Sequence, residues 1–274
     1  MLKIACIQLT SSADLQENIV KIERMVVEAV GQGAGLVATP ENTFLMEKSG
    51  EKSGGEKIFY KQEEHPAIKA SSEMAKNHKV WLLIGSILVA ENNSKLSCNR
   101  SFLFNPKGEI AAHYDKIHLF DVEVGDGQSY RESARIKAGE KVVVADIEFG
   151  KVGMTICYDV RFPQLYNVLA KSGAQIIAVP AAFTEVTGKA HWHILLRARA
   201  IETGCFIVAP AQTGTHAGGR KTYGHSLIIN PWGEIIADAG TEEGIIMAEL
   251  DLSEVDRVRA KIPSLKHGFQ PSLE

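Results

Sequence analysis

The chain has 274 residues, of which 45% are hydrophobic and 23% charged, and its formal net charge is −3. Such a composition is that of a globular protein with a sizeable core, and it argues against a nucleic-acid or membrane partner, both of which favour strongly basic surfaces. No apolar run approaches the ~18 residues of a membrane span. The N-terminus "MLKIACIQLT" starts directly with a strand pattern and lacks the layout of a signal peptide.

The spacing of the cysteines and histidines indicates whether disulfides or metal sites are expected. Four cysteines are far apart and form no CxxC pair: Cys6, Cys98, Cys157 and Cys205. A chain of this size does not need disulfides, so we expect a reducing, cytoplasmic location. The nine histidines form no HExxH or Cys/His ligand spacing, and His191 and His193 face different sides of a predicted helix. We therefore predict neither a metal nor a cofactor.

Short apolar runs alternate with helical patterns along the whole chain. In the first half we predict strands at 2–9, 35–40, 80–89, 101–105 and 109–115, and helices at 15–30 and 66–78. In the second half we predict strands at 151–157, 175–181, 205–211, 225–230 and 234–239, and helices at 163–172 and 190–202. Polar stretches at 47–57, 121–131 and 212–222 are expected to be loops at the rim.

The second half repeats the first in letters as well as in pattern. "GAGLVATPE" at 33–41 returns as "GAQIIAVPA" at 173–181, and "SFLFNPKGEIAA" at 101–112 returns as "SLIINPWGEIIA" at 226–237. The unequal offsets indicate two related halves and not a tandem array. Two such halves predict an α/β protein, a four-layer α-β-β-α sandwich with pseudo-two-fold halves. We expect one domain over 1–274, with a core at about 3–255 and a C-terminal tail at 256–274.

Three residues that can carry chemistry follow predicted strands: Glu41, Lys116 and Cys157. Functional groups of α/β proteins gather at the carboxyl ends of strands. A thiol with a pKa of about 8.5 is mostly protonated at neutral pH, so a nucleophilic cysteine needs a nearby base or cation. A carboxylate can take the thiol proton and an ammonium group can stabilise an oxyanion. Such a trio would attack a carbonyl group and form a thioester.

Each of these residues also has a structural interpretation. Cys157 can be a small core residue, Glu41 a cap of the next turn and Lys116 a solvated charge at a strand end. A papain-like cysteine with histidine and asparagine also stays open, because nine histidines are available. Spacing alone does not choose between these interpretations.

Three motifs in order resemble the nitrilase superfamily of carbon–nitrogen hydrolases: "TPEN", "YDKIHLFD" and "GMTICYDVRFP". The likeness extends from residue 3 to about 255, and the catalytic set of that family is Glu, Lys and Cys in chain order. The resemblance implies the same four-layer fold, with Glu41 as general base, Lys116 as electrostatic stabiliser and Cys157 as nucleophile. It also implies that the backbone N–H of Tyr158 is an oxyanion donor and that Glu132 positions Lys116 or the substrate amide.

Further segments look most like the branch of this superfamily that acts on deaminated glutathione and on 2-oxoglutaramate: "GQSYRES", "TGKAHWHILLRARAIET" and "YGHSLIINPWGEI". Gly125 departs from the proline expected in the rim loop. The resemblance implies an amidase that cleaves a small carboxylated amide through a thioester, with deaminated glutathione as the first expectation. Alternatives are 2-oxoglutaramate or an N-carbamoyl amine or amino acid as substrate, and a catalytically silent metabolite-binding protein.

Five residues are candidates for the substrate pocket. Phe183, Thr184 and His191 flank a loop just beyond the strand predicted at 175–181, and Tyr130 and Arg131 precede Glu132. The predicted helices at 163–172 and 190–204 carry apolar residues beside charged ones. Symmetric dimers are the commonest closed assemblies, and the family likeness points the same way. We therefore expect a homodimer or an assembly of dimers.

Overall fold

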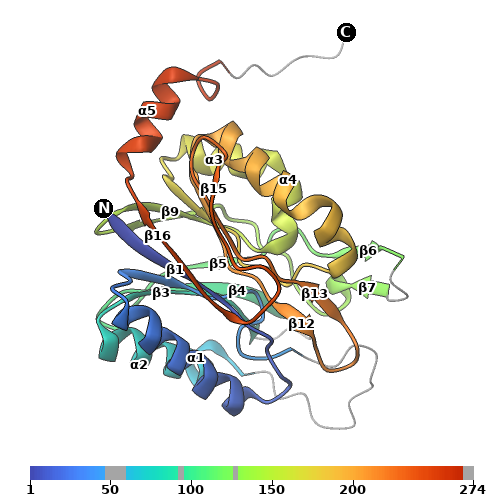
Figure 1. The fold of residues 1–274 in the computed structure, drawn as a ribbon. Coiled ribbons are helices and arrows are strands. Elements are labelled where there is room, and N and C mark those ends of the chain that lie inside the picture. The colour runs from blue at the N-terminus through green and yellow to red at the C-terminus, as the bar shows by residue number, and fades with distance from the viewer. Residues whose placement is uncertain (47–59, 92–95, 126–128, 268–274) are drawn as a thin grey trace.

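The computed structural model describes residues 1–46, 60–91, 96–125 and 129–267. The loop predicted at 47–57 lies outside these residues, as does the end of the predicted tail, 268–274. Two six-stranded sheets pack face to face, and helices cover the two outer faces (Figure 1). The predicted four-layer α-β-β-α sandwich is therefore confirmed.

The first sheet has the strand order β16-β1-β2-β3-β4-β5. Its strands are β1 (Leu2–Gln8), β2 (Leu36–Ala38), β3 (Trp81–Ala90), β4 (Ser97–Phe104), β5 (Ile110–Asp115) and β16 (Gly244–Leu250). Helices α1 (Leu15–Gly31) and α2 (Pro66–His78) pack on its outer face. Helix α1 begins after Asp14, whose carboxylate accepts hydrogen bonds from the N–H groups of Gln16 and Glu17.

The second sheet has the order β15-β14-β11-β10-β9-β8. Its strands are β8 (Val143–Ile147), β9 (Gly150–Met154), β10 (Ile176–Ala178), β11 (Phe206–Ala209), β14 (Leu227–Ile229) and β15 (Ile235–Asp238). Helices α3 (Pro163–Lys171) and α4 (Glu185–Thr203) lie on its outer face (Figure 1). Pro163 opens α3, where its fixed φ suits the first helical position and its missing N–H costs nothing.

The two halves have the same topology. Strands β1, β2 and β3 are parallel neighbours, and β4 and β5 then add antiparallel. Strands β9, β10 and β11 repeat the parallel part, and β14 and β15 repeat the antiparallel part. An antiparallel strand completes each sheet, β16 beside β1 and β8 beside β9. The repeat of letters therefore corresponds to a pseudo-two-fold repeat of structure.

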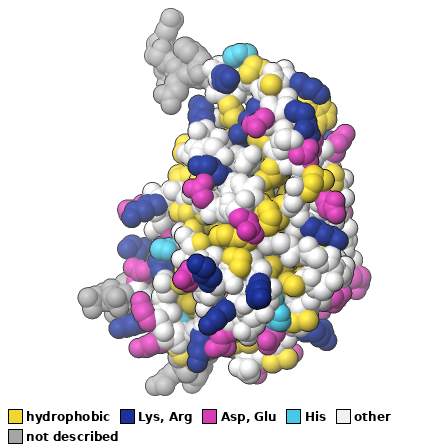
Figure 2. All heavy atoms as spheres, turned by 90° about the vertical axis from the view of Figure 1, so that its left-hand side faces the viewer, with side chains coloured by type: hydrophobic (Ala, Val, Ile, Leu, Met, Phe, Trp, Pro, Cys, Tyr) yellow, Lys and Arg dark blue, Asp and Glu magenta, His cyan; other side chains and the backbone are white. Residues whose placement is uncertain are grey.

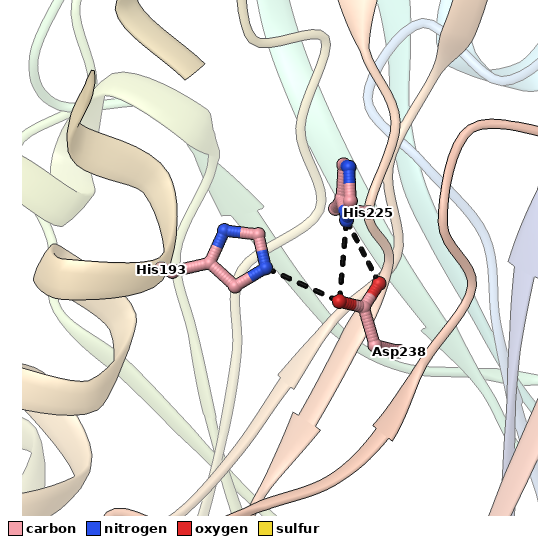
Figure 3. Close-up of side chains that lie close together, drawn as sticks. All are labelled: His193, His225 and Asp238. Carbon is pink, nitrogen blue, oxygen red and sulfur yellow. Dashed lines mark hydrogen bonds and ion pairs between the residues drawn. The ribbon is translucent and has the colours of Figure 1, made fainter. Parts of the chain in front are cut away.

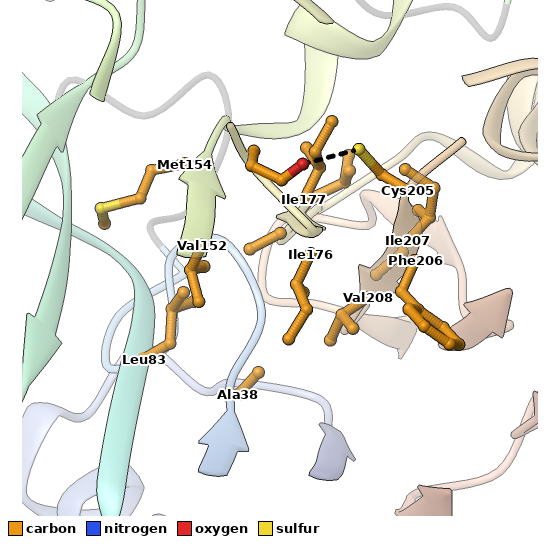
Figure 4. Close-up of a cluster of buried hydrophobic side chains, with 14 of the residues drawn as sticks. Ala38, Leu83, Val152, Met154, Ile176, Ile177, Cys205, Phe206, Ile207 and Val208 are labelled. Carbon is orange, nitrogen blue, oxygen red and sulfur yellow. Dashed lines mark hydrogen bonds between the residues drawn. The ribbon is translucent and has the colours of Figure 1, made fainter. Parts of the chain in front are cut away.

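A layer of buried apolar side chains fills the space between the sheets. Leu83 of the first sheet and Val152, Ile176 and Val208 of the second belong to this cluster (Figure 4). A second cluster lies under α1 and α2. The central parallel strands are thus buried on both faces, which explains their continuous apolar runs.

Several predicted boundaries were wrong. The segments expected as irregular rim loops contain short hairpins: β6 (Asp121–Glu123) with β7 (Ser129–Arg131), and β12 (Thr213–Thr215) with β13 (Lys221–Tyr223). The core does not end at about 255, because helix α5 (Ser253–Lys261) continues it with Val255 and Val258 buried. The described part of the tail predicted at 256–274 is therefore helical up to Lys261.

The surface carries both signs of charge. Figure 2 shows one face of the molecule, on which basic and acidic side chains are interspersed among apolar ones. Over the described residues, none of the helices combines the length and the apolar character that a membrane crossing requires.

Candidate active site

The predicted trio meets in one cavity of about 630 Å³. Glu41 follows β2 and Lys116 follows β5, both in the first sheet, whereas Cys157 follows β9 in the second. All three side chains line the cavity and are almost completely buried, with 2% to 6% of each residue exposed. The cavity therefore forms where the two pseudo-symmetric halves meet.

The backbone before Glu41 packs closely against strand β3, and this contact places Glu41 in the cavity. The segment between β2 and Glu41 passes directly against Gly85 of β3, where a Cβ atom would lie 2.2 Å from the carbonyl oxygens of Thr39 and Pro40. The pairing of β3 with β4 also shifts register near Gly85. A glycine is thus required for the chain to present Glu41 next to β3.

Lys116 lies between two carboxylates. Its Nζ donates to Glu41 Oε1 at 2.8 Å and to Glu132 Oε2 at 2.9 Å. Glu132 opens the short 3-10 helix η2 (Glu132–Ala134), and its Oε2 also accepts the N–H of Phe120 at 2.7 Å. Glu132 therefore lies where the resemblance implied that it would contact Lys116.

Asn99 of β4 connects the two carboxylates and was missed by the sequence analysis. Its Nδ2 donates to Glu41 Oε1 at 3.0 Å and to Glu132 Oε1 at 3.1 Å. Its buried Oδ1 has no hydrogen-bond partner among the described residues. Asn99 precedes the strand predicted at 101–105 and gives no local signal of this role, since the contacts join residues 58 and 33 positions apart.

The protonation states of Glu41 and Lys116 follow from their pairing. Burial raises the pKa of Glu41, whereas the Lys116 charge and the hydrogen bonds from Lys116 and Cys157 lower it. The lowering effects together outweigh burial, so the pKa of Glu41 lies below its usual value. The backbone N–H of Ala182 also donates to Glu41 Oε2 at 2.9 Å. Burial lowers the pKa of Lys116, but the charges of Glu132 and Glu41 outweigh burial and raise it. The pair is a carboxylate and an ammonium group.

Cys157 is held in a strained backbone conformation. It starts the 3-10 helix η3 (Cys157–Arg161) with φ +48°, in the left-handed region that non-glycine residues rarely adopt. Its N–H donates to Pro180 O at 2.9 Å. Burial and the Glu41 charge raise the pKa of the thiol well above its usual range, against the opposing effect of Lys116. The resting group is therefore a neutral thiol beside a carboxylate that can accept its proton.

Asp159 braces the turn that carries Cys157. Its Oδ2 accepts the N–H of Ile156 and the hydroxyl of Tyr114, both at 2.8 Å. Its Oδ1 accepts the N–H of His118 at 3.1 Å and lies 2.7 Å from the Nδ1 of the same residue. Tyr114 and His118 flank Lys116 in sequence, so this fully buried carboxylate fixes the lysine segment to the cysteine turn.

The remaining predicted residues divide into two groups. Tyr158 lines the cavity in the first turn of η3, where helix N–H groups have no partner within the helix, so its role as oxyanion donor stays a prediction. Tyr130, Arg131, Phe183 and Thr184 also line the cavity. His191 does not: its Nδ1 lies 3.3 Å from both terminal nitrogens of Arg161. Its prediction as a pocket residue was wrong, because its position on α4 directs it to Arg161.

Arg220 is a cation in the cavity that the sequence analysis did not single out. It lies in the turn between β12 and β13, and its Nη2 donates to Ala182 O at 2.7 Å. Its guanidinium carbon is 5.6 Å from the ring centroid of Tyr130. Its buried Nε has no hydrogen-bond partner within the described part of the chain. Arg220 therefore retains donors for an anionic ligand.

The α-β-β-α sandwich, with a buried carboxylate, lysine and thiol meeting in one cavity, is the arrangement of a cysteine hydrolase that acts on carbon–nitrogen bonds. The carbon–nitrogen hydrolase family model matches residues 3–260. The deaminated glutathione amidase of Synechocystis is 43% identical to the chain, and the match covers 96% of both proteins. The deaminated glutathione amidase of Yersinia enterocolitica is 40% identical, and the match covers 98% of this chain and 94% of that protein. The crystal structure of Saccharomyces cerevisiae Nit3, a member of branch 10 of the nitrilase superfamily, has a TM-score of 0.85 and 30% identity; the match covers 96% of this chain and 94% of Nit3. The chain belongs to the carbon–nitrogen hydrolase family, as predicted.

We predict that Asn99→Leu lowers kcat/KM by about 100-fold, because it removes the amide that fixes both carboxylates around Lys116. Loss of a hydrogen bond to ionised Glu41 also raises the pKa of that carboxyl group, so the acid limb of the pH profile should move to higher pH. Steady-state kinetics across pH measures both effects.

Asn105→Ala is the matched control for this substitution. Asn105 holds the turn between β4 and β5, where its Oδ1 accepts the N–H groups of Lys107 and Glu109. The control should lower the melting temperature without moving the acid limb. An Asn99→Leu enzyme with the parent pH profile would contradict the positioning role.

Proposed function

We propose that the protein is an amidase that cleaves a small carboxylated amide through a thioester on Cys157. The observation that carries this proposal is the meeting of a neutral thiol, an ionised Glu41 and a charged Lys116 in one cavity. A metabolite-binding protein without catalysis would not require a thiol, a base and a cation in mutual contact.

The first half-reaction forms the acyl-enzyme. The Cys157 sulfur attacks the amide carbonyl carbon while its proton moves to Glu41, which already accepts the thiol hydrogen bond. The Lys116 ammonium group and the N–H of Tyr158 stabilise the negative charge on the carbonyl oxygen. Glu41 then donates the proton to the leaving nitrogen, the C–N bond breaks and the amine departs.

The second half-reaction uses water. Glu41, again a carboxylate, takes a proton from water as the water oxygen attacks the thioester carbonyl. Lys116 and Tyr158 stabilise the same oxyanion. The C–S bond breaks, the sulfur regains a proton from Glu41 and the carboxylic acid product leaves. Glu132 and Asn99 keep Lys116 and Glu41 in place during both steps.

Deaminated glutathione is the proposed substrate. Two relatives at 43% and 40% identity carry the name deaminated glutathione amidase. A cavity of about 630 Å³ is large enough for a peptide-sized amide. Arg220 and Arg131 line it and supply positive charge for the carboxylates of such a molecule. Arg131 already pairs with Glu123 at 2.9 Å, so Arg220 is the stronger candidate.

We also propose a cytoplasmic location, because all four cysteines are free and buried. Disulfide-linked cysteines in protein isolated from its own cells would contradict this location.

The proposed function predicts a higher kcat/KM for deaminated glutathione than for 2-oxoglutaramate, which has ammonia as its leaving group. Arg220→Gln should lower kcat/KM for deaminated glutathione by about 10- to 100-fold, the usual value of a charge-assisted hydrogen bond. A neutral amide without carboxylates should lose much less. Released amine and ammonia are measured separately for each substrate.

Arg257→Gln is the control, because Arg257 is exposed on α5 and pairs with Asp251 away from the cavity. If 2-oxoglutaramate is preferred by about tenfold or more, the protein acts as an omega-amidase. If only a carbamoyl amine is cleaved, both amide assignments fail.

We propose that the protein forms a homodimer through α3, α4 and the β14–β15 hairpin. Val168, Ile194, Ile201 and Trp232 are exposed on these elements, and a second copy would cover them. Ile194→Asp should produce monomers, whereas Val20→Asp, at an exposed valine of α1, should not. Light scattering that gives the 29.9 kDa monomer mass for the parent protein at micromolar concentration would contradict the dimer.

A further inference from the structure

Three side chains with metal-binding donors meet outside the catalytic cavity: His193 of α4, His225 between β13 and β14, and Asp238 at the end of β15 (Figure 3). His225 Nδ1 lies 3.0 Å from Asp238 Oδ1, and His193 Nε2 lies 3.2 Å from Asp238 Oδ2. All candidate ligand atoms lie within 4.8 Å of one another. The three residues come from separate elements, so no spacing in the sequence indicates the cluster.

The three donor groups suit a divalent cation that is intermediate between hard and soft, such as Zn²⁺. Two imidazole nitrogens and one carboxylate oxygen are typical ligands of Zn²⁺. Metal–ligand distances of about 2.0–2.1 Å place the ligand atoms of a tetrahedral site roughly 3.3 Å apart. One carboxylate oxygen, Asp238 Oδ2, lies 3.2 Å from both His225 Nδ1 and His193 Nε2, which is close to this value. Three protein ligands leave the fourth position to water.

The surrounding structure holds His225 and Asp238 in place. His225 has φ +53°, a strained value, and its backbone is fixed at both ends: its N–H donates to Gly240 O at 2.7 Å and its carbonyl accepts Trp192 Nε1 at 2.8 Å. Its ring stacks on Tyr223 with a centroid distance of 4.5 Å. Asp238 Oδ1 accepts the N–H of Gly240 at 2.8 Å. Such supporting contacts orient ligands in metal sites.

We propose that His193, His225 and Asp238 form a Zn²⁺ site that ties α4 to the base of the β12–β13 hairpin. None of the three side chains lines the catalytic cavity. Helix α4 begins directly after Phe183 and Thr184, which do line it, and the turn of the hairpin carries Arg220. The bound ion would therefore stabilise the start of α4 and the β12–β13 hairpin, which both line the cavity, without contacting substrate.

Cobalt is the probe for this site, because Co²⁺ takes the same ligands and absorbs visible light. The full-length Cys157→Ser protein is titrated with Co²⁺, since the parent thiol can itself bind metal ions. We expect saturable binding of one Co²⁺ per chain with the visible bands of a low-coordinate site. Zn²⁺ should displace the cobalt, and the melting temperature should rise with Zn²⁺ concentration.

Single substitutions then assign the ligands. His193→Gln and Asp238→Asn should each weaken Co²⁺ binding by about 100-fold or more. His225→Asn tests the third ligand, since asparagine tolerates the left-handed backbone that this position requires. His191→Gln is the control on the same helix, because His191 contacts Arg161 instead. Absence of saturable binding to the Cys157→Ser protein, or unchanged affinity in His193→Gln, would overturn the proposal.

Discussion

The burial of the Lys116 ammonium group is the constraint on which the site depends. A cation with 2% of its surface exposed is tolerated only with close counter-charges, and Glu41 and Glu132 supply them at 2.8 and 2.9 Å. These carboxylates need partners in turn, which Asn99, Phe120 and Ala182 provide. Removing one partner of such a buried pair typically costs about 3–5 kcal/mol, so the cluster is maintained as a unit.

The same cluster decides how the thiol reacts. Two carboxylates face one ammonium group, and burial, together with the nearby Glu41 charge, keeps the pKa of Cys157 high. The thiol therefore gives up its proton during attack and is not a resting thiolate. A papain-like site would instead pair the cysteine with histidine, and none of the described residues that line this cavity is a histidine. The structure thus favours Glu41 as the base.

Most of the helices and strands could be predicted from the sequence, because apolar periodicity and helix-end residues act over a few neighbouring positions. Helix α2 has the predicted bounds, 66–78, since Pro66 opens it and polar residues close it. Helix α4 begins at Glu185, before the predicted start at 190, and this first part was missed because Thr187 and Gly188 weaken the helix pattern there. A Cβ at Gly188 would lie 2.3 Å from Tyr223 Cγ, so packing against β13 requires this glycine. Strand β16, which pairs with β1 at the other end of the chain, was missed.

The site was predictable only as far as its motifs reached. Glu41, Lys116, Cys157 and Glu132 stand in recognisable segments, whereas Asn99 and Arg220 do not. Asp159 belongs to the cysteine motif, but its bracing role, like the roles of Asn99 and Arg220, depends on contacts that the fold creates. The His193–His225–Asp238 cluster is the extreme case, because three elements must fold before its ligands meet.

If catalysis passes through a covalent thioester on Cys157, intact-mass spectrometry of an acid-quenched reaction in steady state should detect it. We expect a mass increase equal to the acyl part of the substrate, mapped to the peptide that contains Cys157 and absent from the Cys157→Ala protein, which should be folded and inactive. Turnover without an adduct on Cys157, together with more than about a tenth of the parent activity in Cys157→Ala, would contradict it.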